Sequence, residues 1–325
     1  MTEPRILVLG QQDRDIDFSH VYSYLNRHDT IDVKVFAKAD VKQLRKTLSK
    51  LNTANYDRVI LDLPFSKTVK AVSSIRKLPG LIIYEEDACQ NFLPTSKWRG
   101  AFEKYYRALP QATLVMCGYN TADRYRALGL QPHVIPKGYD DQALRNTGTE
   151  RDINLAFIGR TQSKVYSERL ALLEAVGREF ELATLRTASR NEYCDTLNRI
   201  NLFLSADVGL GEYMAKNFEA MACGCTVIAC YQGGAEEEKL GLRDMENIVL
   251  YTSPEEAIAK IHTLQAEPAL ARQIAAAGQA LAEAKFSHTA IADQLIQIAK
   301  SPVPGAPDEP ENFLRRALQG IKNWR

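Results

Sequence analysis

With 325 residues, of which 45% are hydrophobic and 25% charged, the chain has the composition of a folded globular protein, which excludes a disordered or fibrous one. Its length exceeds that of one ordinary domain and predicts two domains of about 150 residues each. The formal net charge of +1 lacks the strong basic excess of nucleic-acid-binding proteins, so we expect no nucleic-acid partner.

The sequence offers no targeting or spanning segment, which predicts a cytoplasmic location. Residues 1–10 run directly into an apolar stretch without the basic segment and cleavage site of a signal peptide. Nowhere do about 18 apolar residues run uninterrupted. The six cysteines lack a paired C-x-x-C framework, which favours a reducing compartment over a disulfide scaffold and predicts no metal site.

Apolar runs at regular spacing organise the first half of the chain. Ile6–Gly10 is typical of a strand that is buried on both faces and ends at a turn. Residues 40–51 place apolar side chains on one stripe and predict an amphipathic helix. Further strand-like runs lie at residues 31–36, 58–63, 81–84, 112–116 and 133–136. This alternation predicts a parallel sheet with helices on both faces.

The same pattern restarts after a polar stretch at residues 140–152, which predicts a linker. We therefore expect an N-terminal Rossmann-like domain over residues 1–145 and a C-terminal one over residues 146–300. Residues 301–325 contain a Pro-rich spacer and a basic amphipathic helix. This helix is expected to pack back on the N-terminal domain or to lie on a membrane surface.

The most informative segment for function is residues 205–225. A strand leads through a loop with two glycines to the start of a helix, where free N–H groups and the helix dipole favour an anion. Lys216 and Glu219 are three residues apart and share a face of that helix. The lysine can hold a diphosphate and the glutamate can accept hydrogen bonds from a ribose. The alternative is an ordinary surface Lys–Glu pair.

The run F-E-A-M-A-C-G-C-T-V-I-A at residues 218–229 resembles the donor signature of retaining GT-B glycosyltransferases with a sucrose-synthase-like C-terminal domain. In that family a loop of the form E-G-F-G precedes L-E-A-M-A-C-G-x-P-V-I. The resemblance implies that Glu219 binds the ribose of a nucleotide-sugar donor, and that Gly211, Glu212 and Lys216 contact its diphosphate and sugar. The family places seven residues between its two glutamates; here six lie between Glu212 and Glu219, so Gly211 stands at the first glutamate's position.

Three further runs carry the same resemblance. F-I-G-R-T-Q-S-K at residues 157–164 is similar to the family's F-V-G-R…K, which implies that Arg160 and Lys164 pair with the donor diphosphate in an enzyme that needs no metal or other cofactor. Residues 134–140 resemble the I-P-N-G-V-D that closes the family's first domain. Residues 168–173, together with 286–288, resemble the spore-maturation-type branch. The resemblance covers about residues 130–300.

The acceptor side is predicted from chemistry. Glu85, Glu86 and Asp87 directly follow a buried strand, and adjacent carboxylates in a cleft raise at least one pKa, as a general base requires. We take Glu86 as the candidate catalytic base and Asp13, after the first glycine turn, as its rival; the other reading for either is a helix N-cap or a solvated loop. Residues 1–150 hold 22 Lys and Arg against 17 Asp and Glu, which favours an anionic acceptor or membrane face.

The sequence thus predicts a GT-B enzyme that transfers a sugar from a nucleoside-diphosphate sugar to a hydroxyl group of a glycan or glycolipid. The resemblance implies cell-envelope polysaccharide or lipopolysaccharide synthesis, with peripheral contact at the inner membrane through the C-terminal helix. Retention of configuration is implied, and inversion is the alternative if Glu86 or Asp13 is a base. A non-catalytic nucleotide-binding scaffold, favoured by the altered glutamate spacing, and a sugar-nucleotide 2-epimerase are the rival functions.

Overall fold

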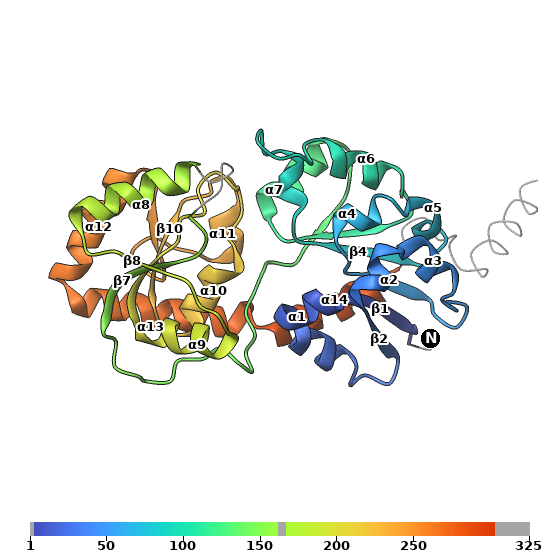
Figure 1. Cartoon of the computed structure of the whole chain (residues 1–325), viewed down its shortest axis with the longest axis horizontal. Coiled ribbons are helices and arrows are strands. Elements are labelled where there is room, and N and C mark those ends of the chain that lie inside the picture. The colour runs from blue at the N-terminus through green and yellow to red at the C-terminus, as the bar shows by residue number, and fades with distance from the viewer. Residues whose placement is uncertain (1–2, 162–166, 303–325) are drawn as a thin grey trace, which may run out of the picture.

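Two separate parallel sheets organise the chain in the computed structural model, which describes residues 3–161 and 167–302 (Figure 1). The first sheet has the strand order β2-β1-β3-β4-β5-β6 and the second β11-β10-β9-β7-β8. The first sheet consists of β1 Ile6–Gln11, β2 Ile31–Phe36, β3 Arg58–Leu61, β4 Leu81–Glu85, β5 Thr113–Met116 and β6 His133–Val134. The second consists of β7 Ile153–Ile158, β8 Ala183–Leu185, β9 Ile200–Leu204, β10 Thr226–Cys230 and β11 Val249–Tyr251. The predicted architecture of two parallel-sheet α/β domains is confirmed.

Helices connect the strands of each lobe, as parallel pairing requires. The first lobe contains α1 Gln12–Leu25, α2 Lys38–Lys42, α3 Leu44–Ser49, α4 Phe65–Thr68, α5 Val72–Ile75, the short 3-10 helix η1 Ala88–Asn91, α6 Ala101–Arg107 and α7 Tyr119–Ala127. The later helices are α8 Ser167–Glu179, α9 Arg190–Arg199, α10 Ala215–Ala222, α11 Glu236–Leu240, α12 Pro254–Ala266, α13 Pro268–Lys285 and α14 His288–Lys300. No helix within residues 3–161 and 167–302 is long and apolar enough to cross a membrane.

The single helix predicted over residues 40–51 is wrong in one respect. The chain leaves helical geometry at Gln43, where φ is −109° and ψ is 37°, and α2 and α3 are separate helices. The predicted apolar stripe survives the break, because Val41, Leu44 and Leu48 are all buried against the first sheet.

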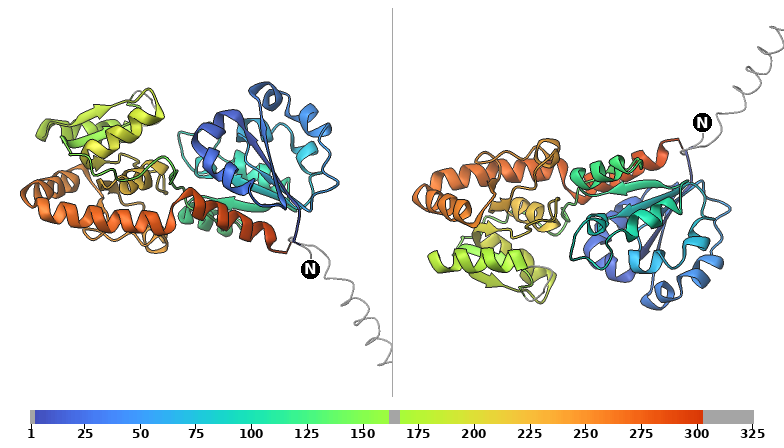
Figure 2. Two further views of the ribbon diagram at one scale, coloured as in Figure 1. Left: turned by 90° about the horizontal axis from the view of Figure 1, so that it is seen from below. Right: turned by 90° about the horizontal axis from the view of Figure 1, so that it is seen from above.

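The last described helix, α14, returns to the first lobe (Figure 2). Ser287 caps it by accepting a hydrogen bond from the N–H of Ala290 at 3.1 Å. Its apolar face joins the core beneath β1, β3 and β4, through Ile291, Ala292, Leu295, Ile296 and Ala299. Residues 288–300 therefore pack with the first sheet, whereas the predicted boundary assigned them to the C-terminal domain. The helix proposed for the tail lies beyond residue 302, outside the described residues.

Arg58 anchors the end of α14 to the first sheet. Its guanidinium donates hydrogen bonds to the carbonyl oxygens of Ala299 at 3.0 Å, Ile298 at 3.2 Å and Ser301 at 2.9 Å. These carbonyls lie at the end of the helix, where Ser301 is the C-cap and its N–H also donates to the carbonyl of Ile298 at 3.1 Å, so the guanidinium supplies the further donors that a helix end lacks. The chain thus crosses between the lobes twice, at the linker after β6 and again between α13 and α14.

Each sheet has a point where the direction of strand addition reverses, between β1 and β3 in the first and between β7 and β9 in the second. Ligands of open α/β sheets bind beyond the carboxyl ends of the strands at such points. The residues that follow these ends are therefore the place to look for a site.

Candidate functional site

A cavity of about 880 Å³ lies between the two lobes, a volume within the range of small-molecule sites. Both lobes contribute to its wall. The first lobe and α14 provide Phe18, Glu86, Asp87, Cys89, Gln90, Leu93, Thr95, Ser96, Lys97, Lys137, Gly138 and His288. The second lobe provides Arg160, Arg169, Asp207, Leu210, Met214, Ala215, Lys216 and Glu219. Four of the predicted site residues, Glu86, Arg160, Lys216 and Glu219, are thereby brought together.

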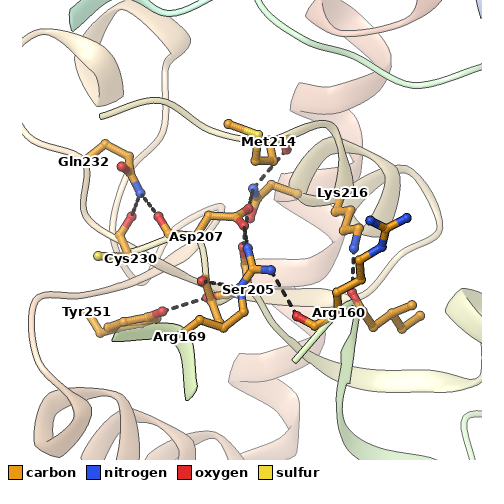
Figure 3. A network of polar contacts seen from close by, with 12 residues as sticks. Arg160, Arg169, Ser205, Asp207, Met214, Lys216, Cys230, Gln232 and Tyr251 are labelled. Atoms are coloured by element: carbon orange, nitrogen blue, oxygen red, sulfur yellow. Dashed lines mark hydrogen bonds and ion pairs between the residues drawn. The ribbon is translucent and has the colours of Figure 1, made fainter. Parts of the chain in front are cut away.

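Three cations gather on the second-lobe wall (Figure 3). Arg160 follows β7, and Lys216 lies in the first turn of α10, where its Nζ donates a hydrogen bond to the carbonyl of Ile158 at 2.8 Å. Burial lowers the pKa of Lys216, although nearby carboxylates oppose the shift. Arg169 comes from α8, and the resemblance at residues 168–173 assigns no role to it. The wall is suited to an anion with several negative oxygens.

Arg169 is held in place by the loop after β9 (Figure 3). Its Nη2 donates to Oδ1 of Asp207 at 2.9 Å and its Nε to the carbonyl of Ala206 at 3.1 Å. Gln232 fixes the same loop from the other side, since its Nε2 donates to the carbonyl of Asp207 at 3.0 Å. Tyr251 donates to the carbonyl of Ser205 at 2.7 Å. The guanidinium of Arg169 is therefore hydrogen-bonded to a loop that Gln232 and Tyr251 hold in place.

The start of α10 completes the anion site. Met214 occupies the N-cap position and makes no side-chain capping hydrogen bond, and Met214, Ala215 and Lys216 all line the cavity. The first N–H groups of a helix have no partner within it, and the helix dipole adds partial positive charge. A phosphate at this helix start would meet backbone donors and cations together.

Glu219 lies one turn further along α10 and also lines the cavity. Tyr193 of α9 donates its hydroxyl hydrogen to Oε2 of Glu219 at 2.5 Å. Burial and the neighbouring carboxylate raise the pKa of Tyr193 well above its ordinary value, so the hydroxyl stays protonated and remains a donor. The carboxylate is therefore held in a fixed orientation about one helical turn from Lys216.

The cavity wall does not include Gly211 or Glu212, in contrast to the predicted donor contacts. The N–H of Gly211 donates to Oε1 of Gln232 at 2.9 Å, within the second lobe. Glu212 is 1% exposed and accepts hydrogen bonds from Lys137 and Thr121, both of the first lobe. The neighbour Leu210 faces the cavity in their place.

On the first-lobe side, Glu86 reaches the cavity, and its Oε1 accepts a hydrogen bond from the Tyr84 hydroxyl at 3.1 Å. Glu86 also lines a neighbouring cavity of about 230 Å³ that Glu85 and Trp98 share. The rival base, Asp13, lies in the first turn of α1. Its side chain, like the whole of Lys164, lies outside the described residues.

The strongly raised pKa of the carboxylate cluster belongs to Glu85. Glu85 is 8% exposed, and burial raises its pKa to about 8, with smaller contributions from Asp87, Asp62 and Glu86. Its Oε1 accepts a hydrogen bond from the N–H of Asp87 at 2.9 Å, which partly offsets the shift. Burial is the main cause of this shift, and the adjacent carboxylates, which the sequence analysis took as the cause, make the smaller contribution.

Replacing Glu85 with glutamine is expected to remove a loss of stability that accompanies a rise in pH from 4.5 to 8. Because the folded-state pKa of about 8 exceeds the ordinary value of 4.5, the folded chain binds this proton more tightly than the unfolded chain. The contribution of Glu85 to the free energy of unfolding should therefore fall between pH 4.5 and 8, by about 1.4 kcal/mol per pH unit. Glutamine stays neutral and keeps an acceptor for the Asp87 N–H. Urea unfolding at pH 6 and 8.5 measures the free energy of unfolding of the wild type and the variant at each pH. If the exposed control Glu174→Gln reduced the loss of stability between these pH values by as much, burial of Glu85 would not be its cause.

Comparisons with known proteins agree with the geometry. Residues 144–297 match a family model described as glycosyl transferase-like, and no curated protein matches the sequence. The structure of HepE from Anabaena in complex with UDP and glucose is similar at a TM-score of 0.68 and 16% identity, covering 92% of this chain and 100% of that one. Sucrose-phosphate synthase from Thermosynechococcus elongatus is similar at a TM-score of 0.68 and 13% identity, covering 90% of this chain and 97% of that one. The structure of a UDP-N-acetylglucosamine 2-epimerase is similar at a TM-score of 0.54 and 9% identity, covering 91% of this chain and 95% of that one. The fold is therefore of the GT-B type.

Proposed function

We propose that this protein is a glycosyltransferase that moves a sugar from a uridine-diphosphate sugar to a hydroxyl group of an acceptor bound by the first lobe. The observation that carries the proposal is the cavity in which a cationic helix start lies one turn from a fixed carboxylate, Glu219. The family match over residues 144–297 supports the reaction class. The complexes of HepE with UDP and with UDP-glucose support the nucleotide.

In this reaction negative charge develops on the departing diphosphate. Arg160, Arg169 and Lys216 line the wall that would receive it, and fixed positive groups at such a point stabilise the transition state more than the ground state. We propose that these side chains and the start of α10 supply the positive charge without a metal ion. Transfer is then expected to continue in the presence of EDTA.

The acceptor hydroxyl would approach from the first-lobe wall, where Glu86, Gln90 and Lys97 line the cavity. Retention of configuration at the sugar is our proposal on the basis of the sequence resemblance, and a glycan or glycolipid of the cell envelope is the proposed acceptor. Should Glu86 act as a base on the acceptor hydroxyl, the product would be inverted instead. Proton NMR of the product made from UDP-glucose distinguishes these outcomes by the coupling constant of the new anomeric proton.

A nucleotide-binding scaffold is the second candidate, and the position of Glu212 favours it. The family's first glutamate is replaced by Gly211, and Glu212 is buried away from the cavity. A scaffold would bind the nucleotide without turning over the sugar.

The proposal is tested by calorimetric titration of the full chain with UDP, ADP, GDP and UDP-glucose, followed by an assay of UDP release with glycan acceptors. We expect UDP and UDP-glucose to bind more tightly than ADP or GDP, and release to depend on an acceptor. Binding without release would support the scaffold, and conversion of a UDP-sugar to its 2-epimer without acceptor would support an epimerase. Failure of every nucleotide to bind would overturn the proposal.

A further inference from the structure

A buried ion pair joins the two lobes beside the cavity. Glu212 belongs to the second-lobe loop before α10 and is 1% exposed. Its Oε1 accepts a hydrogen bond from Nζ of Lys137, a first-lobe residue that is 7% exposed, at 2.5 Å. Its Oε2 accepts one from the hydroxyl of Thr121 in α7 at 2.9 Å. Burial alone would lower the pKa of Lys137, but Glu212 and the smaller contributions of nearby groups together raise that pKa well above the ordinary value, so the lysine is charged.

The first lobe is shaped to receive this carboxylate. Gly118 is the N-cap of α7, and a Cβ atom there would come within 2.6 Å of Oε2 and 2.7 Å of Cβ of Glu212. No residue other than glycine therefore fits at position 118 without displacing the glutamate. The start of a helix also favours a negative charge. The site is thus complementary to Glu212 in both shape and charge.

A second set of contacts holds the same helix start to the second lobe. The N–H of Asn120 donates to Oε2 of Glu236 at 2.9 Å, and its side-chain amide donates to the carbonyl of Gly233 at 2.6 Å. The N–H of Ala235 donates to Oδ1 of Asn120 at 3.2 Å. The lobes therefore meet at α7 through bonds whose directions are specific to one relative orientation.

Both partners of the ion pair lie in backbone segments that form the cavity wall. Lys137 and its neighbour Gly138 line the cavity from the first lobe. Glu212 lies between Leu210 and Met214, which line it from the second lobe. Breaking a buried pair by removing one partner leaves an uncompensated charge, so the pair strongly favours the arrangement in which it forms.

We propose that Glu212 is a positioning residue that, through Lys137, sets the two lobes at the distance required for transfer. This inference rests on the proposed function and adds a role for a residue that sequence resemblance assigned to sugar binding. The shift of one residue in glutamate spacing places Gly211, with φ of +73°, at the family position and directs the carboxylate of Glu212 to the first lobe. In this proposal Glu219 binds the donor and Glu212 positions the lobes.

The test compares Glu212→Gln and Lys137→Met with the matched control Asp152→Asn, which breaks an exposed ion pair with Arg199 inside the second lobe. For both test variants we expect the affinity for UDP to stay within about threefold of wild type, because its contacts lie on the second lobe. The kcat for transfer should fall at least tenfold, and small-angle scattering should show a larger radius of gyration. The control should change none of these.

Thr121→Val, which removes one hydrogen bond and no charge, should cause a smaller change in the same direction and covers the case in which a charge variant does not fold. Loss of UDP-glucose affinity with UDP affinity intact in Glu212→Gln alone would assign the glutamate to the sugar and overturn the proposal. A lower melting temperature with unchanged kcat and radius of gyration would reduce the pair to a structural role and also overturn it. Failure of the proposed function can be told apart from failure of this inference. In that case the wild type would not bind UDP, but Glu212→Gln and Lys137→Met would still increase the radius of gyration.

Discussion

Replacing Glu219 with alanine is expected to weaken the binding of uridine and of UDP by the same factor, about 10- to 150-fold. The carboxylate lines the cavity beside the start of α10, where we propose that the ribose of the bound nucleotide lies. Hydrogen bonds to a charged acceptor contribute about 1.5–3 kcal/mol, which corresponds to that range. Because both ligands carry the ribose, both should lose the same free energy of binding. Calorimetric titration of each ligand against wild type and variant measures the two factors.

Two further variants sharpen this experiment. Tyr193→Phe removes the hydroxyl that donates to Glu219 and should weaken both ligands in the same direction but by less, since the carboxylate remains. Glu174→Ala removes an exposed glutamate of the same lobe and should leave both affinities unchanged. A Glu219→Ala variant that loses UDP but still binds uridine as wild type does would show that the carboxylate does not contact the ribose.

The features that the sequence could predict are those encoded within a few adjacent residues. Apolar runs ended by glycine mark strands such as β1 and β7 because a strand buried on both faces needs an uninterrupted apolar stretch. Lys216 and Glu219 were predicted to share a helix face from their spacing alone, and both line the cavity. The short edge strand β11 also lies in an apolar run, residues 248–251, although the sequence analysis did not predict it.

The features that could not be predicted depend on contacts between distant residues. Arg169 joins the cation cluster because it meets Asp207, 38 residues away in the chain. Nothing near position 169 specifies that partner. The apolar face of α14 predicts burial but does not indicate which sheet will cover it. The sequence therefore grouped this helix with the C-terminal domain, whereas its apolar face packs on the first sheet. Glu212 is the sharpest case, since its sequence context resembles a sugar-binding loop while its partner Lys137 lies 75 residues earlier in the other lobe.

Replacing Lys216 with methionine is expected to leave the affinity for uridine unchanged while lowering that for UDP, and to reduce the kcat for transfer by about 10²- to 10³-fold. The ammonium group lies at the start of α10, where we propose that the diphosphate binds, and methionine fills a similar volume without the charge. A cation that meets the leaving group acts most strongly on the charge that develops during transfer. The kcat should therefore fall in addition to the loss of UDP affinity. Titration with the two ligands and steady-state kinetics with UDP-glucose measure the three effects.

Lys239→Met, which removes an exposed lysine of α11, is the matched control and should alter none of these quantities.

Lys216→Met and Glu219→Ala should have different effects on the two ligands. Glu219→Ala should weaken the binding of uridine and UDP equally, and Lys216→Met should weaken the binding of UDP alone. This contrast separates a nucleotide site with distinct ribose and diphosphate contacts from a general anion site on a basic surface. In a general anion site, Lys216→Met would lower the affinity for inorganic pyrophosphate as much as for UDP, and Glu219→Ala would strengthen both by removing a negative charge. Equal weakening of uridine in the Lys216 variant would place this lysine elsewhere than at the diphosphate, because a side chain that contacts only the phosphates has nothing to lose when they are absent.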